Sequence, residues 1–475
     1  MLLSGTDNHI AGLGTMAEMK ALTTQYDDVV GYEGYLNFQV AALPELLRDA
    51  GYHTYMTGKW HLGAKNDQTP AARGFEKYFS LIDGGASHLN HLGYSMNHKV
   101  ADYRNDDKTV EKLPEDFYST RFYTERMMDY IVSNHGDGKP FFGYLAYTAP
   151  HWPLMAPDSS IAKYKGRYSE GYRAIQQQRL ARMKKLGLIS EDEYVGMTIP
   201  KDWDQLSEEE RAKEARAMEI YAAMIDDIDI YIGRLLDHLK SIGARENTLI
   251  IFMSDNGAEG HDFSHTPGIT DWVEQCCDVS LDNMGKGNSY VWYGPGWGTV
   301  SSTPLGGYKG SPMQGGIRVP AFIVHPEIAG ERINREPLTV MDIMPTILEV
   351  AGIEHPAPQY KGRDVVKMRG ESLWPMLKGD VTRAHPEDYV IARELFGRRS
   401  VQKGDWSIVS LGKSHDDSEW KLYDLSQDIS QSKDLSIKEP AILADMIRHW
   451  EQYQKDFNVV MPTKKSAYEP ILFTV

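Results

Sequence analysis

The fold class follows from one stretch, ARAMEIYAAMIDDIDIYIGRLLDHLKSIGARENTLIIFMSDNG at Ala215–Gly257, which joins a helical pattern to a strand pattern. Apolar residues recur at spacings of three and four, at Ile220, Met224, Ile228, Ile232, Leu235 and Leu239. This spacing predicts an amphipathic helix over Ala215–Ile242, ended by Gly243. Thr248–Met253 is then a short apolar run typical of a buried strand. A helix followed directly by such a strand is typical of α/β proteins.

The same alternation recurs on both sides of this stretch. Helices are predicted over Leu43–Asp49, Ser119–Ser133 and Asp342–Ala351, and strands over Tyr52–Thr57, Phe141–Tyr147 and Pro320–Val324. We therefore expect an α/β fold with a mostly parallel central sheet flanked by helices. Two segments, Tyr164–Ala215 and Gly260–Gly307, have the composition of long insertions beside a site.

The composition changes near Lys378–Glu387. Beyond it, YVIARELFGRRSVQKGDWSIVSL and WKLYDLSQD alternate like antiparallel strands, and Glu439–Phe457 has the pattern of a closing helix. These features predict a small C-terminal subdomain made of an antiparallel sheet and one helix. The expected domains are residues 1–380 and residues 381–475.

Composition excludes several classes of protein. The 475 residues are 41% hydrophobic and 25% charged, which is ordinary for a globular protein. The net charge of −16 argues against nucleic acid as a partner. No apolar run is long enough to span a membrane, and MLLSGTD does not resemble a signal peptide. The compartment and the oligomeric state are left open.

The chain contains only two cysteines, Cys276 and Cys277, which are adjacent. Two cysteines cannot form a disulfide framework, and neighbouring cysteines seldom bridge each other. We therefore expect two small, partly buried residues here.

Polar side chains follow several of the predicted strands. The motifs are TGKWHLG (57–63), APHWPL (149–154), SDNG (254–257) and YKGSPMQGGIRVP (308–320). They place Lys59, His61, His151, Asp255 and Asn256 at strand ends, where open α/β sheets bind ligands. Lys309 lies in a glycine-rich loop, which permits close backbone approach to an anion. Lysine and histidine suit an anionic ester, whereas the oxygens of Asp255 and Asn256 suit a hard divalent cation.

The order and spacing of these four motifs resemble the sulfatase family of the alkaline-phosphatase-like superfamily, and especially the large bacterial arylsulfatases. The resemblance implies a small-molecule sulfate ester as substrate, clamped by Lys59 and Lys309. It implies that His61 orients and deprotonates the formylglycine nucleophile, and that His151 protonates the leaving group or holds the sulfate. It also implies calcium, for which Asp255 and Asn256 would supply part of the site.

Other parts of the family pattern have no match in this sequence. The family carries its nucleophile in a C-x-P-x-R signature directly before a segment like MLLSGTDNHIAGLG, and two consecutive aspartates on the first strand complete the calcium site. No C-x-P-x-R occurs here, and Asp27-Asp28 and Asp106-Asp107 lie in a predicted loop and a predicted turn. We therefore expect the chain to start just after its nucleophile, to hold a partial calcium site and to be inactive as given.

Three functional interpretations remain open at this stage. The first is an arylsulfatase-type sulfuric ester hydrolase; aromatic residues at Trp152, Tyr290, Trp292, Tyr293 and Trp297 would favour a flat or apolar leaving group. The second is a non-catalytic protein that binds anions or sulfate esters. The third is a phosphonate or phosphate ester hydrolase of the same superfamily.

Overall fold

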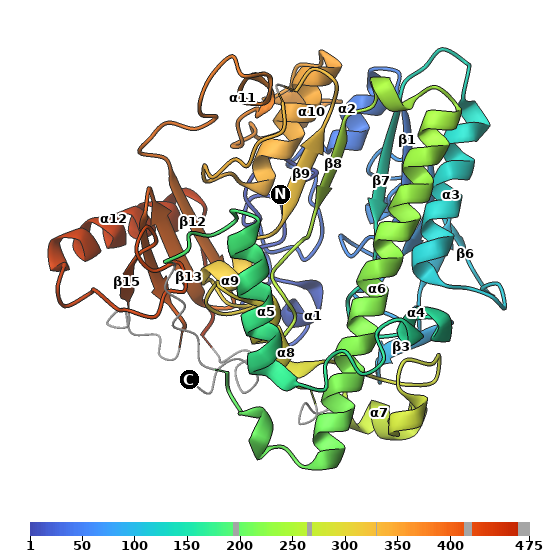
Figure 1. Cartoon of the computed structure of the whole chain (residues 1–475). Coiled ribbons are helices and arrows are strands. Elements are labelled where there is room, and N and C mark those ends of the chain that lie inside the picture. Colours follow the sequence, from blue (N-terminus) through green and yellow to red (C-terminus); the bar gives the residue numbers. More distant parts are fainter. Residues whose placement is uncertain (193–198, 264–267, 329, 413–419, 464–475) are drawn as a thin grey trace.

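The computed structural model of the chain describes residues 1–192, 199–263, 268–328, 330–412 and 420–463 (Figure 1). Its helices are α1 (Ala17–Lys20), α2 (Leu43–Asp49), α3 (Ser119–Asn134), α4 (Asp158–Ala162), α5 (Gly171–Lys185), α6 (Glu208–Ser241), α7 (Thr270–Cys276), α8 (Gly294–Ser302), α9 (Gln314–Ile317), α10 (Ile343–Ala351), α11 (Trp374–Lys378) and α12 (Pro440–Asp456). Among the helices so described, none combines the length and apolar character needed to cross a bilayer.

The strands within the described residues form five sheets. The strands are β1 (His53–Lys59), β2 (Lys77–Leu81), β3 (Leu92–Ser95), β4 (His98–Val100), β5 (Tyr103–Asn105), β6 (Lys108–Thr109), β7 (Phe141–Ala146), β8 (Ile250–Met253), β9 (Ala321–Val324), β10 (Gln359–Tyr360), β11 (Arg363–Asp364), β12 (Val390–Leu395), β13 (Arg398–Lys403), β14 (Trp406–Ser410) and β15 (Lys421–Asp424). The largest sheet has the strand order β6-β5-β2-β1-β7. Its centre is parallel, because β1 pairs in parallel with β2 and β7, but β5 and β6 are antiparallel, so the sheet is mixed.

Helices cover both faces of this sheet, as predicted. Successive residues of a strand point to opposite faces. Tyr55 packs in one buried cluster with Met127 of α3 and Leu239 of α6. Met56, the next residue, packs in another cluster that contains Leu46 of α2 and Leu348 of α10. The α/β fold expected from the sequence is therefore confirmed.

Helix α6 begins earlier than the apolar pattern predicted. Ser207 caps it: its hydroxyl accepts a hydrogen bond from the backbone N–H of Glu210, and the Glu210 carboxylate accepts one from the backbone N–H of Ser207. This reciprocal arrangement satisfies backbone donors that a helix start otherwise leaves open. The first turns of α6 thus lie in the segment that was predicted to be an insertion.

Strands β8 and β9 form a separate antiparallel pair. Within the described ranges no strand ladder joins β7 to β8, yet α10 packs on both sheets, since Ile347 contacts the cores on either side. Phe322 and Val324 of β9 are 52% and 39% exposed. Because β7 is the last strand of the large sheet and β8 pairs only with β9 among the described strands, both sheets present open strand edges.

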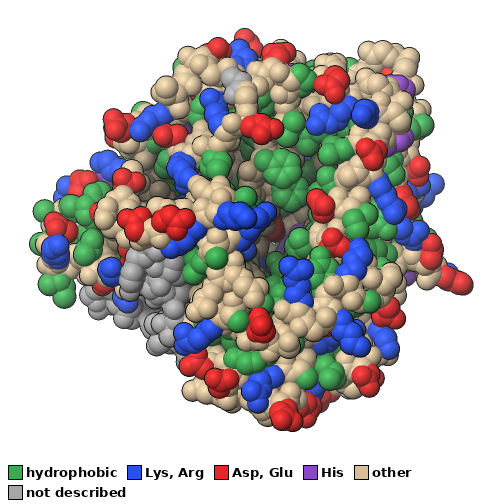
Figure 2. All heavy atoms as spheres, viewed as in Figure 1, with side chains coloured by type: hydrophobic (Ala, Val, Ile, Leu, Met, Phe, Trp, Pro, Cys, Tyr) green, Lys and Arg blue, Asp and Glu red, His purple; other side chains and the backbone are tan. Residues whose placement is uncertain are grey.

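Figure 2 shows hydrophobic side chains and Lys or Arg side chains around a hollow near the centre of the face that it draws.

The C-terminal subdomain agrees with the prediction. Strands β12 to β15 form an antiparallel sheet in sequence order, and α12 packs on it through Met446 and Trp450. A buried histidine joins this subdomain to the start of the chain. His9 Nε2 lies 2.9 Å from Glu394 Oε2, and His9 Nδ1 lies 2.8 Å from Asp7 Oδ1. Burial alone would lower the pKa of His9, but these two hydrogen bonds raise it to about 9.

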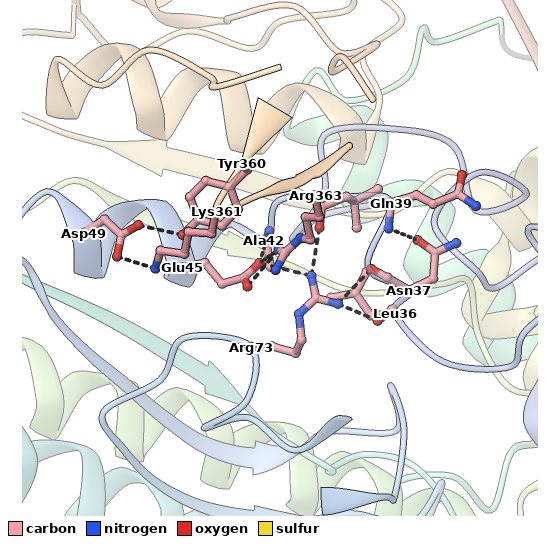
Figure 3. Close-up of polar contacts among 11 residues, drawn as sticks. Leu36, Asn37, Gln39, Ala42, Glu45, Asp49, Arg73, Tyr360, Lys361 and Arg363 are labelled. Atoms are coloured by element: carbon pink, nitrogen blue, oxygen red, sulfur yellow. Dashed lines mark hydrogen bonds and ion pairs between the residues drawn. The ribbon is translucent and has the colours of Figure 1, made fainter. Parts of the chain in front are cut away.

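A second buried polar network fixes the loop before α2 (Figure 3). The guanidinium of Arg73, which is fully buried, donates to the carbonyls of Leu36, Asn37 and Val40 and lies 3.1 Å from Glu45 Oε2. Arg363 of β11 donates to both oxygens of the same carboxylate, at 2.9 Å. One carboxylate thus holds two arginines from distant parts of the chain.

Candidate active site

The first group of site residues lies where β1 ends. Lys59 is the last residue of the strand, and His61 follows it with a φ of 50°, which turns the backbone out of the extended conformation. The His61 ring rests on Gly84, where a side chain would collide with ring atom Cε1. His61 Nε2 lies 2.7 Å from Glu18 Oε1 of α1. The strand thus delivers a lysine and an oriented imidazole to one edge.

His151 follows the neighbouring strand, β7, and is partly buried. Its Nδ1 lies 2.6 Å from the carbonyl oxygen of Trp152. A carbonyl can only accept, so Nδ1 carries the proton and Nε2 keeps its lone pair. Burial, followed by the positive charges of Lys309 and Lys59, holds the pKa of His151 well below its ordinary value. The neutral imidazole therefore faces a site that contains both lysines.

The third group combines the end of β8 with the glycine-rich loop. The Gly257 N–H donates to the carbonyl of Gly316, and the Lys309 N–H donates to the carbonyl of Ala258. A side chain at Gly257 would overlap the carbonyl oxygen of Gly315, so glycine is required for this close approach. The loop that carries Lys309 is in this way attached directly to the segment that follows Asp255 and Asn256.

Two acidic residues that the sequence analysis missed belong to this site. Glu259 Oε2 lies 2.9 Å from Lys309 Nζ, and its other oxygen contacts His261 Nδ1. Burial would raise the pKa of Glu259, but Lys309 and His261 hold it well below its usual range. Glu18 is the second: burial works against its ionisation, and the hydrogen bond from His61 lowers its pKa to about 2. Glu259 stands two residues beyond the SDNG motif, which was the available signal.

Electrostatic coupling shows that these groups share one environment. The pKa of Lys59 is lowered to about 8, first by burial and then by the positive charge of Lys309. The negative charges of Asp255, Glu18 and Glu259 act in the opposite direction. The structure therefore brings together the predicted Lys59, Lys309, His151 and Asp255.

A calcium ion does not fit the described residues alone. Calcium takes six to eight oxygen ligands. Asp255 is exposed, and Asn256 donates its side-chain N–H to the carbonyl of Gly257. Across the described ranges no group of three or more His, Cys, Asp or Glu side chains has a geometry that could hold a metal. Asp255 and Asn256 could supply two oxygens of such a site, and we derive no chemical step from it.

An aromatic cluster adjoins His151. Trp152 lies with its ring centre 4.8 Å from that of His151, and it packs with Phe263 at 4.7 Å and Tyr290 at 5.9 Å. Trp292 packs against the same cluster. Tyr293 and Trp297, which the sequence analysis grouped with these residues, lie instead in the larger core around α6 and α8.

Cys276 and Cys277 are partly buried, as expected, but the expectation that they are not bridged was wrong. Cys276 and Cys277 form a disulfide between adjacent residues at the end of α7. Both pack against the aromatic cluster of Trp152, Phe263 and Tyr290. Because bridges between neighbouring cysteines are rare in general, the sequence alone did not predict this one.

A site with two lysines and two histidines beside the strand ends of an α/β sheet has groups that suit an anionic ligand. Comparison with known proteins gives the family. The sulfatase family model matches residues 1–353, and the chain belongs to the sulfatase family. It is 43% identical over 474 residues to an uncharacterized sulfatase of Schizosaccharomyces pombe, covering 97% of this chain and 85% of that one.

Two further comparisons agree. The chain is 39% identical over 383 residues to an arylsulfatase of Klebsiella aerogenes, covering 78% of this chain and 80% of the relative. The solved structure of Ps i-CgsB in complex with k-i-k-neocarrahexaose superposes with a TM-score of 0.65 at 22% identity, covering 98% of this chain and 82% of that one. This structural likeness supports the fold.

Proposed function

We propose that the protein is an arylsulfatase-type sulfuric ester hydrolase, acting on small-molecule sulfate monoesters. The observation that carries the proposal is the convergence of Lys59, Lys309 and His151 in one partly buried site of a sulfatase-family chain. In this proposal Lys59 and Lys309 hold the sulfate oxygens through charge-assisted hydrogen bonds. Such preorganised cations stabilise charge that develops on the ester during cleavage.

The two histidines have separate roles in this proposal. His61 would orient and deprotonate the nucleophile's hydroxyl. His151 would hold the sulfate or protonate the leaving oxygen, which requires a proton on Nε2. The two lysines disfavour that proton before substrate binds, and a bound sulfate would offset their charge. Substrate binding would therefore favour the protonated form of His151.

The aromatic cluster supports an aryl leaving group. Trp152 follows His151 directly, and Tyr94, whose ring centre lies 6.4 Å from that of Trp152, has its hydroxyl oxygen 3.4 Å from Glu18 Oε1. Aromatic side chains thus border the site on the side of both histidines. Flat aromatic surfaces favour a flat apolar group.

Two groups that the resemblance implies have no counterpart in residues 1–475. These are the C-x-P-x-R nucleophile and the paired aspartates of the calcium site. The open edges of β7 and β8 support a place for the strand that would end in those aspartates. We expect residues 1–475 alone to bind aryl sulfates and to hydrolyse them negligibly, since clamps do not replace a covalent nucleophile. A non-catalytic sulfate-ester-binding role is the second candidate, because Lys59, Lys309 and His151 together could hold an anionic ester without cleaving it.

The test is calorimetric titration with 4-nitrophenyl sulfate, 4-nitrophenyl phosphate and 4-nitrophenol. We expect the sulfate to bind, and Lys59→Met and Lys309→Met each to weaken binding by about tenfold or more. Lys438→Met, at an exposed position, is the matched control. Equal binding by all variants would overturn the site, and tighter binding of the phosphate would favour a phosphate ester hydrolase. Turnover by residues 1–475 that is abolished in His61→Ala would refute the expectation about the nucleophile.

A further inference from the structure

Glu18 is a partly buried acid on the short helix α1, and its side-chain contacts are with residues of the site. Its Oε1 lies 2.7 Å from His61 Nε2, and the hydroxyl of Tyr94 approaches the same oxygen at 3.4 Å. The side chains of His61 and Glu18 are 24% and 30% exposed. Glu18 Oε2 is buried and has no hydrogen-bond partner. Withdrawing an ionised carboxylate from water costs free energy unless the carboxylate is paired or hydrogen-bonded.

The geometry constrains the imidazole in two ways. Glu18 binds only Nε2, and the ring rests against Gly84, where a methyl group would stand 2.9 Å from Cε1. The two ring nitrogens of histidine are distinct, and the hydrogen bond made by one fixes the state of the other. A carboxylate at Nε2 requires the proton there, so the lone pair of the neutral ring is on Nδ1.

We propose that Glu18 is a positioning residue for His61, which holds the ring in the Nε2–H tautomer and leaves Nδ1 as its basic nitrogen. The role of Nδ1, which is to accept the proton of a hydroxyl in the site, rests on the proposed function. The tautomer of His61 itself rests only on the contacts of the described residues.

Other charged groups face this pair. Lys59 lies close enough for the charge of Glu18 to raise its pKa, and His98 acts on Glu18 from β4. Neither makes a described hydrogen bond to the His61 ring, whereas Glu18 does. We therefore expect Glu18 to be the main determinant of the His61 tautomer.

The experiment is nuclear magnetic resonance of the 475-residue chain labelled with ¹⁵N-histidine, with the His61 signals assigned by their loss in His61→Gln. Long-range ¹H–¹⁵N correlation distinguishes protonated from unprotonated ring nitrogens. At a pH where the ring is neutral, we expect Nε2 to be protonated and Nδ1 unprotonated in the wild type. In Glu18→Gln the ratio of this tautomer to the other should fall by about tenfold or more, because a charge-assisted hydrogen bond is lost.

Two further variants complete the test. Glu451→Gln, at an exposed position of α12, should leave the His61 signals unchanged. Gly84→Ala should displace the ring from Glu18 and reduce the same ratio, which tests the proposal without altering the acid. A wild-type ring protonated on Nδ1, or a ratio unchanged in both Glu18→Gln and Gly84→Ala, would overturn it. Failure of 4-nitrophenyl sulfate to bind would overturn the proposed function and leave the tautomer assignment standing.

Discussion

Replacing Lys59 with methionine is expected to stabilise the protein near neutral pH while it weakens anion binding. Methionine keeps an apolar stem of similar length and removes the ammonium group. Burial and the charge of Lys309 lower the pKa of Lys59 from 10.5 to about 8. At 1.36 kcal/mol for each pH unit, this difference corresponds to about 3 kcal/mol. Because Lys59 keeps partial contact with solvent, we expect a gain of about 2 kcal/mol in the free energy of unfolding.

The sign of the pH dependence follows from the direction of this change. Between pH 8 and pH 10.5 the unfolded chain holds the Lys59 proton and the folded protein does not. The free energy of unfolding of the wild type therefore rises across this window, whereas below pH 8 the full cost of the buried charge is present. The advantage of Lys59→Met should consequently shrink as the pH is raised from about 7 to about 10.

Urea unfolding followed by tryptophan fluorescence measures this difference at each pH. Lys438→Met is the control, because removing an exposed lysine should change stability by less than about 0.5 kcal/mol. A Lys59→Met variant that is less stable than the wild type near pH 7, or a difference that does not change with pH, would refute the reasoning. Either result would mean that the ammonium of Lys59 is fully compensated in the absence of a ligand.

Three further predictions concern the buried polar networks and the metal. Arg73→Leu should lower the free energy of unfolding by about 3–5 kcal/mol, since it strips a fully buried partner from Glu45, whereas Lys361→Ala should cost less than about 1 kcal/mol. The stability contributed by the raised pKa of His9 should be complete below pH 6.5 and lost as the pH rises through about 9, so the deficit of His9→Gln should narrow over that range. Calorimetry on residues 1–475 should show no tight calcium site, because Asp255 and Asn256 supply too few oxygens.

Each of these predictions has a contradicting result. Equal losses in Arg73→Leu and Lys361→Ala would show that the network around Glu45 contributes no more than a surface pair. A deficit in His9→Gln that does not narrow above pH 6.5 would show that His9 acts without its proton. A calcium site with micromolar or better affinity, lost in Asp255→Ala, would mean that other carboxylates complete it.

Much of the fold could be predicted from hydrophobic periodicity. The pattern of Ile220, Met224 and Ile228 located α6, and the apolar run after Gly243 located β8. The start of α6 was missed because Ser207 and Glu210 determine it by capping, outside the apolar pattern. The antiparallel pairing of β8 with β9 was also missed, since strand direction depends on how the chain returns between them and not on residue type.

The site residues that stand in sequence motifs were predicted. Those that only the fold brings close to the site were missed. Lys59, His151 and Lys309 stand in recognisable segments, and the charge of Lys309 lowers the pKa values of Lys59 and His151 in the structure. Glu18 belongs to a four-residue helix with no pattern of its own, and only its approach to His61 shows its place. Acidic partners of catalytic groups come from any part of a chain, so spacing along the sequence does not reveal them.

The central claim is that this site binds a sulfate ester between two lysines. The most direct measurement is a crystal structure of the chain soaked with 4-nitrophenyl sulfate, in which anomalous scattering locates the sulfur. The account predicts the sulfate within hydrogen-bonding distance of Lys59 Nζ and Lys309 Nζ, with the aryl ring toward Trp152. Sulfur located elsewhere, with Lys309 still paired to Glu259 and the lysines free of the ester, would contradict it.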